Sequence, residues 1–271
     1  MKIFKERHKL QNHLSKEKGI SFVPTMGGLH PGHLSLIKKS KRLKHKVLVS
    51  IFVNPKQFNK RNDYTSYPRD LKKDIKQLKK LKINYLYLPS YKDIYGFKPK
   101  YKIFLDKTSK ILCGKYRKGH FEGVLNVVNR FLEIIKPRYI FMGKKDYQQL
   151  YLIKKHIVKR KIKTKLIECE TKRELNGVAY STRNLNLNKK QLVIASNIYH
   201  FLRNIKKNYN YNYCFLNLKK ISKEILKLGA SKIDYIDNYN PSNFKKVIKP
   251  NKNFNIFIAY YLKKIRLIDN I

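Results

Sequence analysis

Strand-like and helix-like segments alternate through the first two-thirds of this 271-residue chain, and this alternation constrains the fold more than any other feature. Short apolar runs indicate strands, and apolar residues at helical spacing indicate helices between them. Strands are expected at 19–23, 45–53, 84–88, 138–142 and 164–170, and helices at 71–78, 122–136 and 146–160. Such alternation produces right-handed βαβ crossovers. We therefore predict an α/β fold, a Rossmann-like doubly wound parallel sheet with helices on both faces, whose ligands lie at the carboxyl ends of the strands.

The pattern changes after Asn184. Residues 186–213 are rich in Asn, Lys and Tyr, end in an alternating Asn-Tyr run, and are expected to span a helix and a surface loop. The elements expected beyond this segment are a helix near 218–228 and strands near 233–236 and 255–261. We therefore predict two domains: a catalytic domain at 1–184 and a smaller α+β C-terminal lid domain at 185–271.

A glycine-rich turn directly follows the first predicted strand, in the sequence Val-Pro-Thr-Met-Gly-Gly-Leu-His-Pro-Gly-His at 23–33. The glycines let the backbone approach a ligand, and the N–H groups of the helix that follows attract anions. His30 and His33 can share one side of the turn and donate to the oxygens of a reacting phosphate. The spacing differs from both the P-loop and the Rossmann glycine motif. The turn predicts a triphosphate site, the alternative being a glycine turn with two solvated histidines.

The composition is strongly basic, with 63 Lys and Arg against 17 Asp and Glu and a net charge of +46. Such a charge favours nucleic acid or an anionic membrane as a partner. The lysines are nevertheless scattered along the whole chain among many Ile, Asn and Tyr residues, which is typical of AT-rich codon usage. We therefore expect no specific nucleic acid, and a nucleic-acid role stays open only as an alternative.

The cysteines and the hydropathy limit the compartment. Cys113, Cys169 and Cys214 are odd in number and widely spaced, which favours reduced thiols over a disulfide framework or a zinc site. No apolar run approaches the roughly 18 residues of a membrane span, and charges interrupt the amino terminus. The sequence therefore predicts a cytoplasmic protein without a membrane partner.

Five further motifs follow in order. They are Ser-Ile-Phe-Val-Asn-Pro-Lys-Gln-Phe at 50–58, Tyr-Pro-Arg at 67–69, Gly-Lys-Tyr-Arg-Lys-Gly-His-Phe-Glu-Gly-Val at 114–124, Gly-Lys-Lys-Asp-Tyr-Gln-Gln-Leu at 143–150 and Tyr-Ser-Thr-Arg-Asn at 180–184. With the glycine-rich turn, they closely resemble the pantothenate synthetases (pantoate:β-alanine ligases) of the His-x-Gly-His nucleotidyltransferase superfamily. The resemblance runs from about residue 20 to 184 and returns at 266–270.

The resemblance implies a two-step, ATP-dependent ligation in pantothenate and coenzyme A biosynthesis. The carboxylate of (R)-pantoate attacks the α-phosphate of ATP, giving pantoyl adenylate and pyrophosphate, and the β-alanine amine then displaces AMP. It also implies Mg²⁺ and a homodimer. The alternative is a related adenylyltransferase acting on a phosphorylated substrate. Gln57 and Gln149 argue against it, because a phosphate acceptor would favour cations there.

The resemblance also assigns the site residues. His33 would be the proton donor and His30 its partner at the phosphates, while Lys145 and Arg183 would clamp phosphate charge. Gln57 would bind pantoate and β-alanine, and Gln149 would bind pantoate. The implied ATP-binding residues are Met26, Gly27, Gly28, Leu29, His30, Pro31, Gly32, His33, Gly143, Lys144, Lys145, Asp146, Lys172, Tyr180, Ser181, Thr182 and Arg183.

Several positions depart from the family pattern. Lys73 replaces a usual acidic residue, so Asp74 is expected either to hold Mg²⁺ alone or to leave the ion to ATP oxygens and water. Lys144, Tyr180 and Thr182 stand where glutamate, an apolar residue and serine are common. The roles of residues 117–128 stay open: Arg117 and His120 for a structural or mobile loop, and Val124, Val127 and Val128 for helix core or an apolar wall around pantoate.

Overall fold

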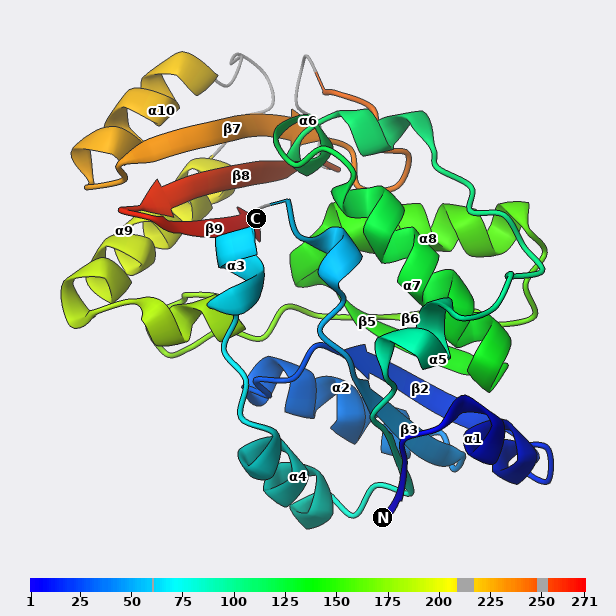
Figure 1. Cartoon of the computed structure of the whole chain (residues 1–271). Helices are drawn as coiled ribbons and strands as arrows, with labels where there is room; N and C mark the ends of the chain where they lie inside the picture. The colour runs from blue at the N-terminus through cyan, green and yellow to red at the C-terminus, as the bar shows by residue number, and fades with distance from the viewer. Residues whose placement is uncertain (60, 209–216, 248–252) are drawn as a thin grey trace. The chain divides into compact units, whose positions relative to one another are not determined.

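The computed structural model describes residues 1–59, 61–208, 217–247 and 253–271, and Figure 1 shows its elements in chain order. The chain divides into two compact units. The first comprises Met1–Ser109 and Arg117–Thr171, and the second comprises Lys110–Tyr116 and Lys172–Ile271. The boundary predicted after Asn184 lies inside the second unit. Arg173 lies in the intervening stretch, and its guanidinium binds the Asp269 carboxylate at 2.6 and 2.9 Å, which ties the start of the second unit to its last strand.

The first unit contains a sheet of six parallel strands in the order β1-β4-β3-β2-β5-β6. The strands are β1 (Lys2–Phe4), β2 (Ile20–Thr25), β3 (Lys46–Ile51), β4 (Tyr85–Tyr87), β5 (Tyr139–Gly143) and β6 (Lys165–Cys169). The predicted doubly wound parallel sheet is confirmed. The chain builds outward from β2 to β3 and β4, and then returns to the other side of β2 with β5. A topological switch point therefore lies between β2 and β5, where ligands of such sheets bind.

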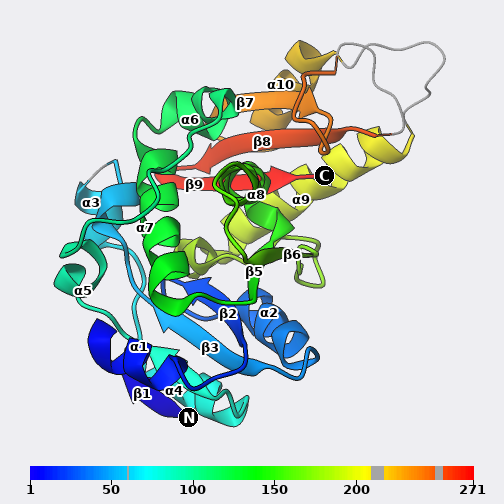
Figure 2. The same cartoon turned by 90° about the vertical axis from the view of Figure 1, so that its right-hand side faces the viewer.

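Helices cover both faces of this sheet, and alternate strand residues face each layer. One core holds Phe22, Leu48 and Ile140, and the other holds the neighbouring residues Val23 and Val49. The first core includes residues of α1 (Arg7–Leu14), α5 (Tyr91–Tyr95), α7 (His120–Ile135) and α8 (Tyr147–Lys159). The second includes residues of α2 (Pro31–Lys41) and α4 (Leu71–Lys80), and Figure 2 shows α2 and α7 on the two sides of the sheet. The short helix α3 spans Arg61–Thr65.

The second unit is an antiparallel sheet in the order β7-β8-β9, covered by two long helices. Its elements are α6 (Cys113–Tyr116), α9 (Lys189–Lys207), α10 (Leu218–Lys227), β7 (Lys232–Tyr239), β8 (Asn255–Leu262) and β9 (Ile265–Asn270). Ile198 of α9 and Ile225 of α10 share one core with Ile256 and Ile258 of β8. The predicted small α+β region is confirmed, and β9 is an addition to it. Most of the predicted Asn-Tyr run lies outside the described residues, as does Cys214.

Short 3-10 turns lie between these helices and strands. They span Pro55–Gln57, Lys107–Lys110, Lys144–Asp146 and Thr182–Asn186. None of the helices in the described ranges has the length and apolar character needed to cross a membrane.

Candidate active site

The turn after β2 reaches the switch point in a conformation that only glycine adopts readily. Gly27 and Gly28 have φ angles of +80° and +60°, in the left-handed region. The Thr25 hydroxyl donates to Ser50 O at 2.7 Å and accepts the Gly27 N–H at 3.3 Å. Helix α2 then begins at Pro31, and the side chain of its N-cap residue, His30, makes no capping hydrogen bond. The N–H groups of this first turn therefore offer an anion site.

Asp74 of α4 lies beneath this turn. Its Oδ2 accepts the Gly28 N–H at 2.9 Å, and its Oδ1 accepts the Leu29 N–H at 2.8 Å. Burial raises the pKa of the Asp74 carboxyl group, and these two hydrogen bonds oppose the shift. The predicted ATP contacts of Gly28 and Leu29 and the predicted Mg²⁺ contact of Asp74 thus involve groups that bind each other.

His30 and His33 form a close pair on the turn. Their ring centroids lie 4.0 Å apart at an interplanar angle of 32°. Burial lowers the pKa of His30 to about 4 and that of His33 to about 3, and the positive charge of Lys145 lowers both further. Both rings are therefore uncharged at neutral pH. Nδ1 of His33 is buried and has no hydrogen-bond partner in the part of the chain that the structure describes.

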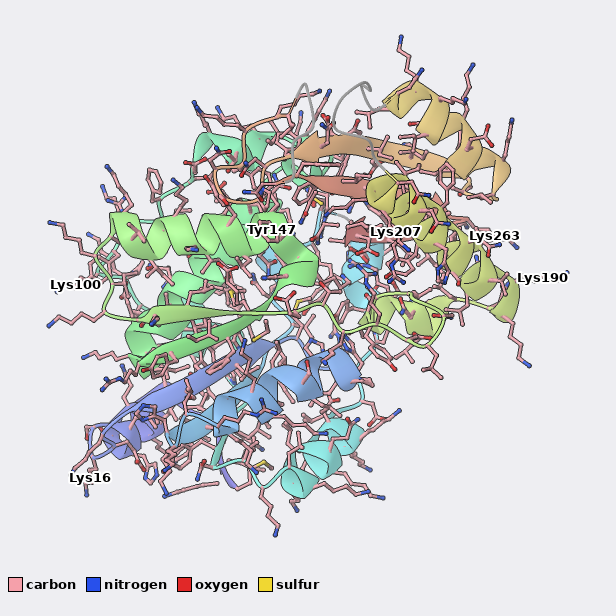
Figure 3. The ribbon with its side chains drawn as sticks, turned by 180° about the vertical axis from the view of Figure 1, so that it is seen from behind. Lys16, Lys100, Tyr147, Lys190, Lys207 and Lys263 are labelled. Carbon is pink, nitrogen blue, oxygen red and sulfur yellow. The ribbon has the colours of Figure 1, made fainter. Side chains whose placement is uncertain are left out.

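The turn after β5 supplies the charge beside this pair. Lys144, Lys145 and Asp146 form a 3-10 turn, and α8 follows at Tyr147, which Figure 3 labels. Lys145 Nζ lies 3.5 Å from Asp146 Oδ1, and its side chain is only 18% exposed. Lys144 Nζ instead binds Glu170 Oε1 at 2.6 Å. The structure thus brings His30, His33 and Lys145 together at the switch point, as the motif analysis predicts.

Asn54 organises the loop after β3. It is 1% exposed, and its Nδ2 donates to Gly123 O at 3.1 Å and to Gln57 Oε1 at 3.2 Å. Its Oδ1 accepts the Tyr95 hydroxyl at 2.7 Å. Gln57 Nε2 lies 2.9 Å from Met26 Sδ, so this amide borders the turn after β2. Asn54 was assigned no role from the sequence, although its amide directly after an apolar strand was a usable signal.

His120 and Arg117 hold the same loop from the other side. His120 Nδ1 bonds Gln57 O at 2.8 Å, and Arg117 Nη2 donates to that carbonyl at 3.3 Å. Arg117 Nη1 lies 3.0 Å from His120 Nε2, which fixes the ring between the two partners. A Cβ atom on Gly123 would lie 2.2 Å from Lys56 O, so only glycine lets α7 approach this closely. The structure therefore connects both residues to the backbone of Gln57.

The remaining candidates of the first unit lie on helices. Gln149 is in the first turn of α8, while its neighbour Gln148 is buried and donates to Thr108 O at 2.7 Å. The three valines of α7 left open by the sequence are buried in the core of the first unit: Val124, Val127 and Val128. Their core role is therefore observed, and a pantoate wall stays a prediction.

The remaining ATP-binding candidates belong to the second unit. Tyr180 N–H donates to Lys172 O at 3.0 Å, and the Ser181 hydroxyl accepts the Arg183 N–H at 3.3 Å. Thr182 is buried, with 4% of its surface exposed. The second unit thus orders this segment, and its contact with ATP stays a prediction.

The described side chains do not gather into a cluster of metal ligands. Across the described ranges, no group of three or more His, Cys, Asp or Glu side chains is placed to hold a metal ion. Both oxygens of Asp74 accept backbone N–H groups, and its neighbour Lys73 is a cation. Each oxygen of Asp74 thus already accepts one hydrogen bond, and its contact with Mg²⁺ stays a prediction.

The family model of pantoate-beta-alanine ligase matches residues 2–271. The chain belongs to the pantoate-beta-alanine ligase family. A pantothenate synthetase of Francisella tularensis subsp. novicida is 43% identical to it over 272 residues, covering 98% of this chain and 94% of the relative. The predicted family and its ligase class are confirmed.

Solved structures of the pantoate-beta-alanine ligase family agree. The enzyme of Francisella tularensis, in complex with β,γ ATP and β-alanine, has a TM-score of 0.85 at 40% identity, covering 100% of this chain and 97% of the other. The enzyme of Thermus thermophilus has a TM-score of 0.91 at 29% identity, covering 100% and 99%. The fold of this chain is therefore the fold of the family over its whole length.

Proposed function

We propose that this protein condenses pantoate with β-alanine to form pantothenate, at the expense of ATP and through pantoyl adenylate. The observation that carries the proposal is the family match over residues 2–271, together with the histidine pair and Lys145 at the switch point. The predicted cytoplasmic location, homodimer and place in coenzyme A biosynthesis belong to the same proposal.

In the first step, a carboxylate oxygen of pantoate attacks the α-phosphorus of ATP, and the bond to the β-phosphate oxygen breaks to release pyrophosphate. The uncharged rings of His30 and His33 each carry one N–H that can donate to phosphate oxygens. Lys145 adds a positive charge where negative charge grows. Bound phosphates would also raise the lowered pKa of His33, so that the ring can take up a proton and pass it to the leaving group.

In the second step, the β-alanine amine attacks the acyl carbon of the adenylate and loses a proton, and the acyl C–O bond breaks, so that AMP departs with the former carboxylate oxygen. Gln57 is held by Asn54 at its side chain and by His120 at its carbonyl. A neutral amide fixed in this way can orient pantoate and the incoming amine without neutralising either reacting group. We propose that Gln149, at the start of α8, binds pantoate as well.

Magnesium would enter with the triphosphate, whose oxygens and bound waters are its usual ligands. Lys172, Tyr180, Ser181, Thr182 and Arg183 would complete the ATP contacts, with Arg183 on phosphate. The basic surface needs no partner in this proposal: Figure 3 shows the side chains of Lys16, Lys100 and Lys190 pointing outward from separate segments of the chain.

The test is AMP release by purified protein supplied with Mg-ATP and pantoate, with and without β-alanine. We expect AMP and pantothenate in equal amounts only when both acids are present, and pyrophosphate in the same amount. When the same assay is applied to His33→Ala, the matched control is His200→Ala, a substitution of an exposed histidine of α9. If AMP instead stays attached to a phosphorylated acceptor, the protein is an adenylyltransferase and not a ligase. ATP binding without any AMP formation would reject both.

A further inference from the structure

The glycine-rich turn has an anion of the protein itself beneath it. Two successive residues with positive φ, Gly27 and Gly28, point the N–H groups of Gly28 and Leu29 to one side. Backbone of this shape forms a concave anion site, which phosphate occupies in many nucleotide-binding loops. Here the Asp74 carboxylate occupies it, with one oxygen on each N–H at 2.9 and 2.8 Å.

We propose that Asp74 is a positioning residue that holds the turn 26–29 in its ATP-binding shape and does not coordinate magnesium. The inference rests on the proposed ATP-dependent ligation for its catalytic consequence, but not for the contact itself. Hydrogen bonds to an ionised acceptor are about twice as strong as neutral ones, and Asp74 makes two of them while only 2% exposed. The carboxylate is thus a specific anchor for the turn.

Helix α4 provides a rigid base for this anchor. Leu78, one turn after Asp74, is fully buried, and the Asp70 carboxylate caps the helix by accepting the Lys73 N–H at 2.9 Å. Gln77 Nε2 lies 3.5 Å from Leu29 O, so α4 approaches both polar groups of the Leu29 backbone. The turn therefore follows the position of α4.

The fit is tight at the glycines. A Cβ atom on Gly27 would lie 3.0 Å from Asp74 Oδ2 and 3.1 Å from Ile51 Cγ2. A side chain at position 27 would therefore press on the Asp74 carboxylate, and moving the turn away from α4 would break both hydrogen bonds. Asp74 thereby sets where the first turn of α2 begins, and with it the positions of His30 and His33. The Gly28 and Leu29 N–H groups are thus used within the protein, and phosphate binds other donors.

The experiment compares Asp74→Asn with the wild type, and uses Asp70→Asn as the matched control. Asp70→Asn removes the same charge one turn earlier, and asparagine caps helices as well as aspartate. Amide exchange is followed by NMR without ligand. We expect exchange at Gly28 and Leu29 to accelerate roughly tenfold or more in Asp74→Asn, the factor of one lost charge-assisted hydrogen bond. Exchange at Leu78 and all rates in Asp70→Asn should stay as in the wild type.

Kinetics separate positioning from metal binding. In Asp74→Asn, kcat/KM for ATP should fall about 100-fold, the scale of a misplaced reacting group, while the Mg²⁺ concentration that gives half-maximal activity is unchanged. A higher Mg²⁺ requirement with unchanged exchange at Gly28 and Leu29 would overturn the inference. So would a Gly28 amide resonance of the wild type that shifts with Mg²⁺ alone, a measurement that needs no variant. If the wild type makes no pantothenate, the ligation proposal fails, and the exchange rates still decide the anchor.

Discussion

Two histidine sites of the first unit share a lowered pKa but differ in the partners of their ring nitrogens. Burial lowers the pKa of His33 to about 3 and that of His156 to about 4. His156 uses both ring nitrogens: Nδ1 accepts the Phe104 N–H at 3.1 Å, and Nε2 bonds Asn129 Oδ1 at 3.0 Å. The buried Nδ1 of His33 has no such partner within the described residues, and its ring faces His30.

The comparison shows that a lowered histidine pKa reports burial and does not by itself mark a catalytic site. At His156, both nitrogens are spent on joining α8, α7 and the segment before them, so the ring is structural. At His33, hydrogen-bonding capacity is kept at the carboxyl end of the sheet beside a second ring and a cation. A buried polar atom without a partner is costly, and persists where a ligand supplies the bond.

The largest expected effect is the loss of turnover when His33 is replaced. His33→Ala should lower kcat at least about 100-fold, because it removes a transition-state donor, and should change the free energy of unfolding little. AMP release and denaturant unfolding measure the two quantities on the same preparation. An unchanged kcat would remove the distinction between the two histidines.

Replacement of His156 should change stability and leave turnover unchanged. His156→Ala leaves the Phe104 N–H and Asn129 Oδ1 without the histidine as their partner, so the free energy of unfolding should fall by about 2–5 kcal/mol. Turnover of the folded fraction should match the wild type. Lys155→Ala, an exposed neighbour on α8, is the control, and equal stability of the two variants would contradict the structural role.

Acid should weaken the fold through both sites. The folded-state pKa values of His30, His33 and His156 lie below the 6.5 of an ordinary histidine. Between about pH 6.5 and 4 the unfolded chain binds protons that the folded chain does not, so stability is present above this window and declines as pH falls through it. Denaturant unfolding at several pH values tests this. Bound ATP should reduce the part of this pH dependence that comes from His30 and His33 and leave the part from His156 unchanged. An equal effect on the His156 part would contradict the difference between the two sites.

The smallest expected effect is on the part of the lowered pKa of His30 and His33 that comes from the charge of Lys145. Lys145→Gln should raise the pKa of His30 and His33 modestly, since burial is the larger cause of both shifts, and should leave that of His156 at about 4. Ring-proton NMR titration measures all three. Lys144→Gln is the matched control, because that lysine binds Glu170 and does not contribute to either shift. Equal shifts in the two variants would mean that Lys145 is not the neighbouring charge.

Two strands and the unit boundary could not be predicted from the sequence, for physical reasons. Strand β1 has only three residues, and two of them are exposed, so no periodicity marks it. Strand β9 pairs with β8 across a two-residue turn in which Lys263 takes a φ of +54°, where glycine or asparagine would have signalled a hairpin. The start of the second unit makes contacts distant in sequence, such as the Arg173–Asp269 ion pair, whose partners lie 96 positions apart.

The sequence by itself determined the parallel sheet, the glycine turn before α2, the histidine pair and the family. These follow from periodicity and motif spacing within short segments, where neighbouring residues carry the signal. Only the tertiary structure decided that Asp74 binds Gly28 and Leu29, and that Asn54 and His120 hold Gln57. It also decided which buried histidine is satisfied. The partners of Asp74 lie 45 and 46 positions away, and such hydrogen bonds exist only once helices and strands have packed, because they need both groups within about 3 Å of each other.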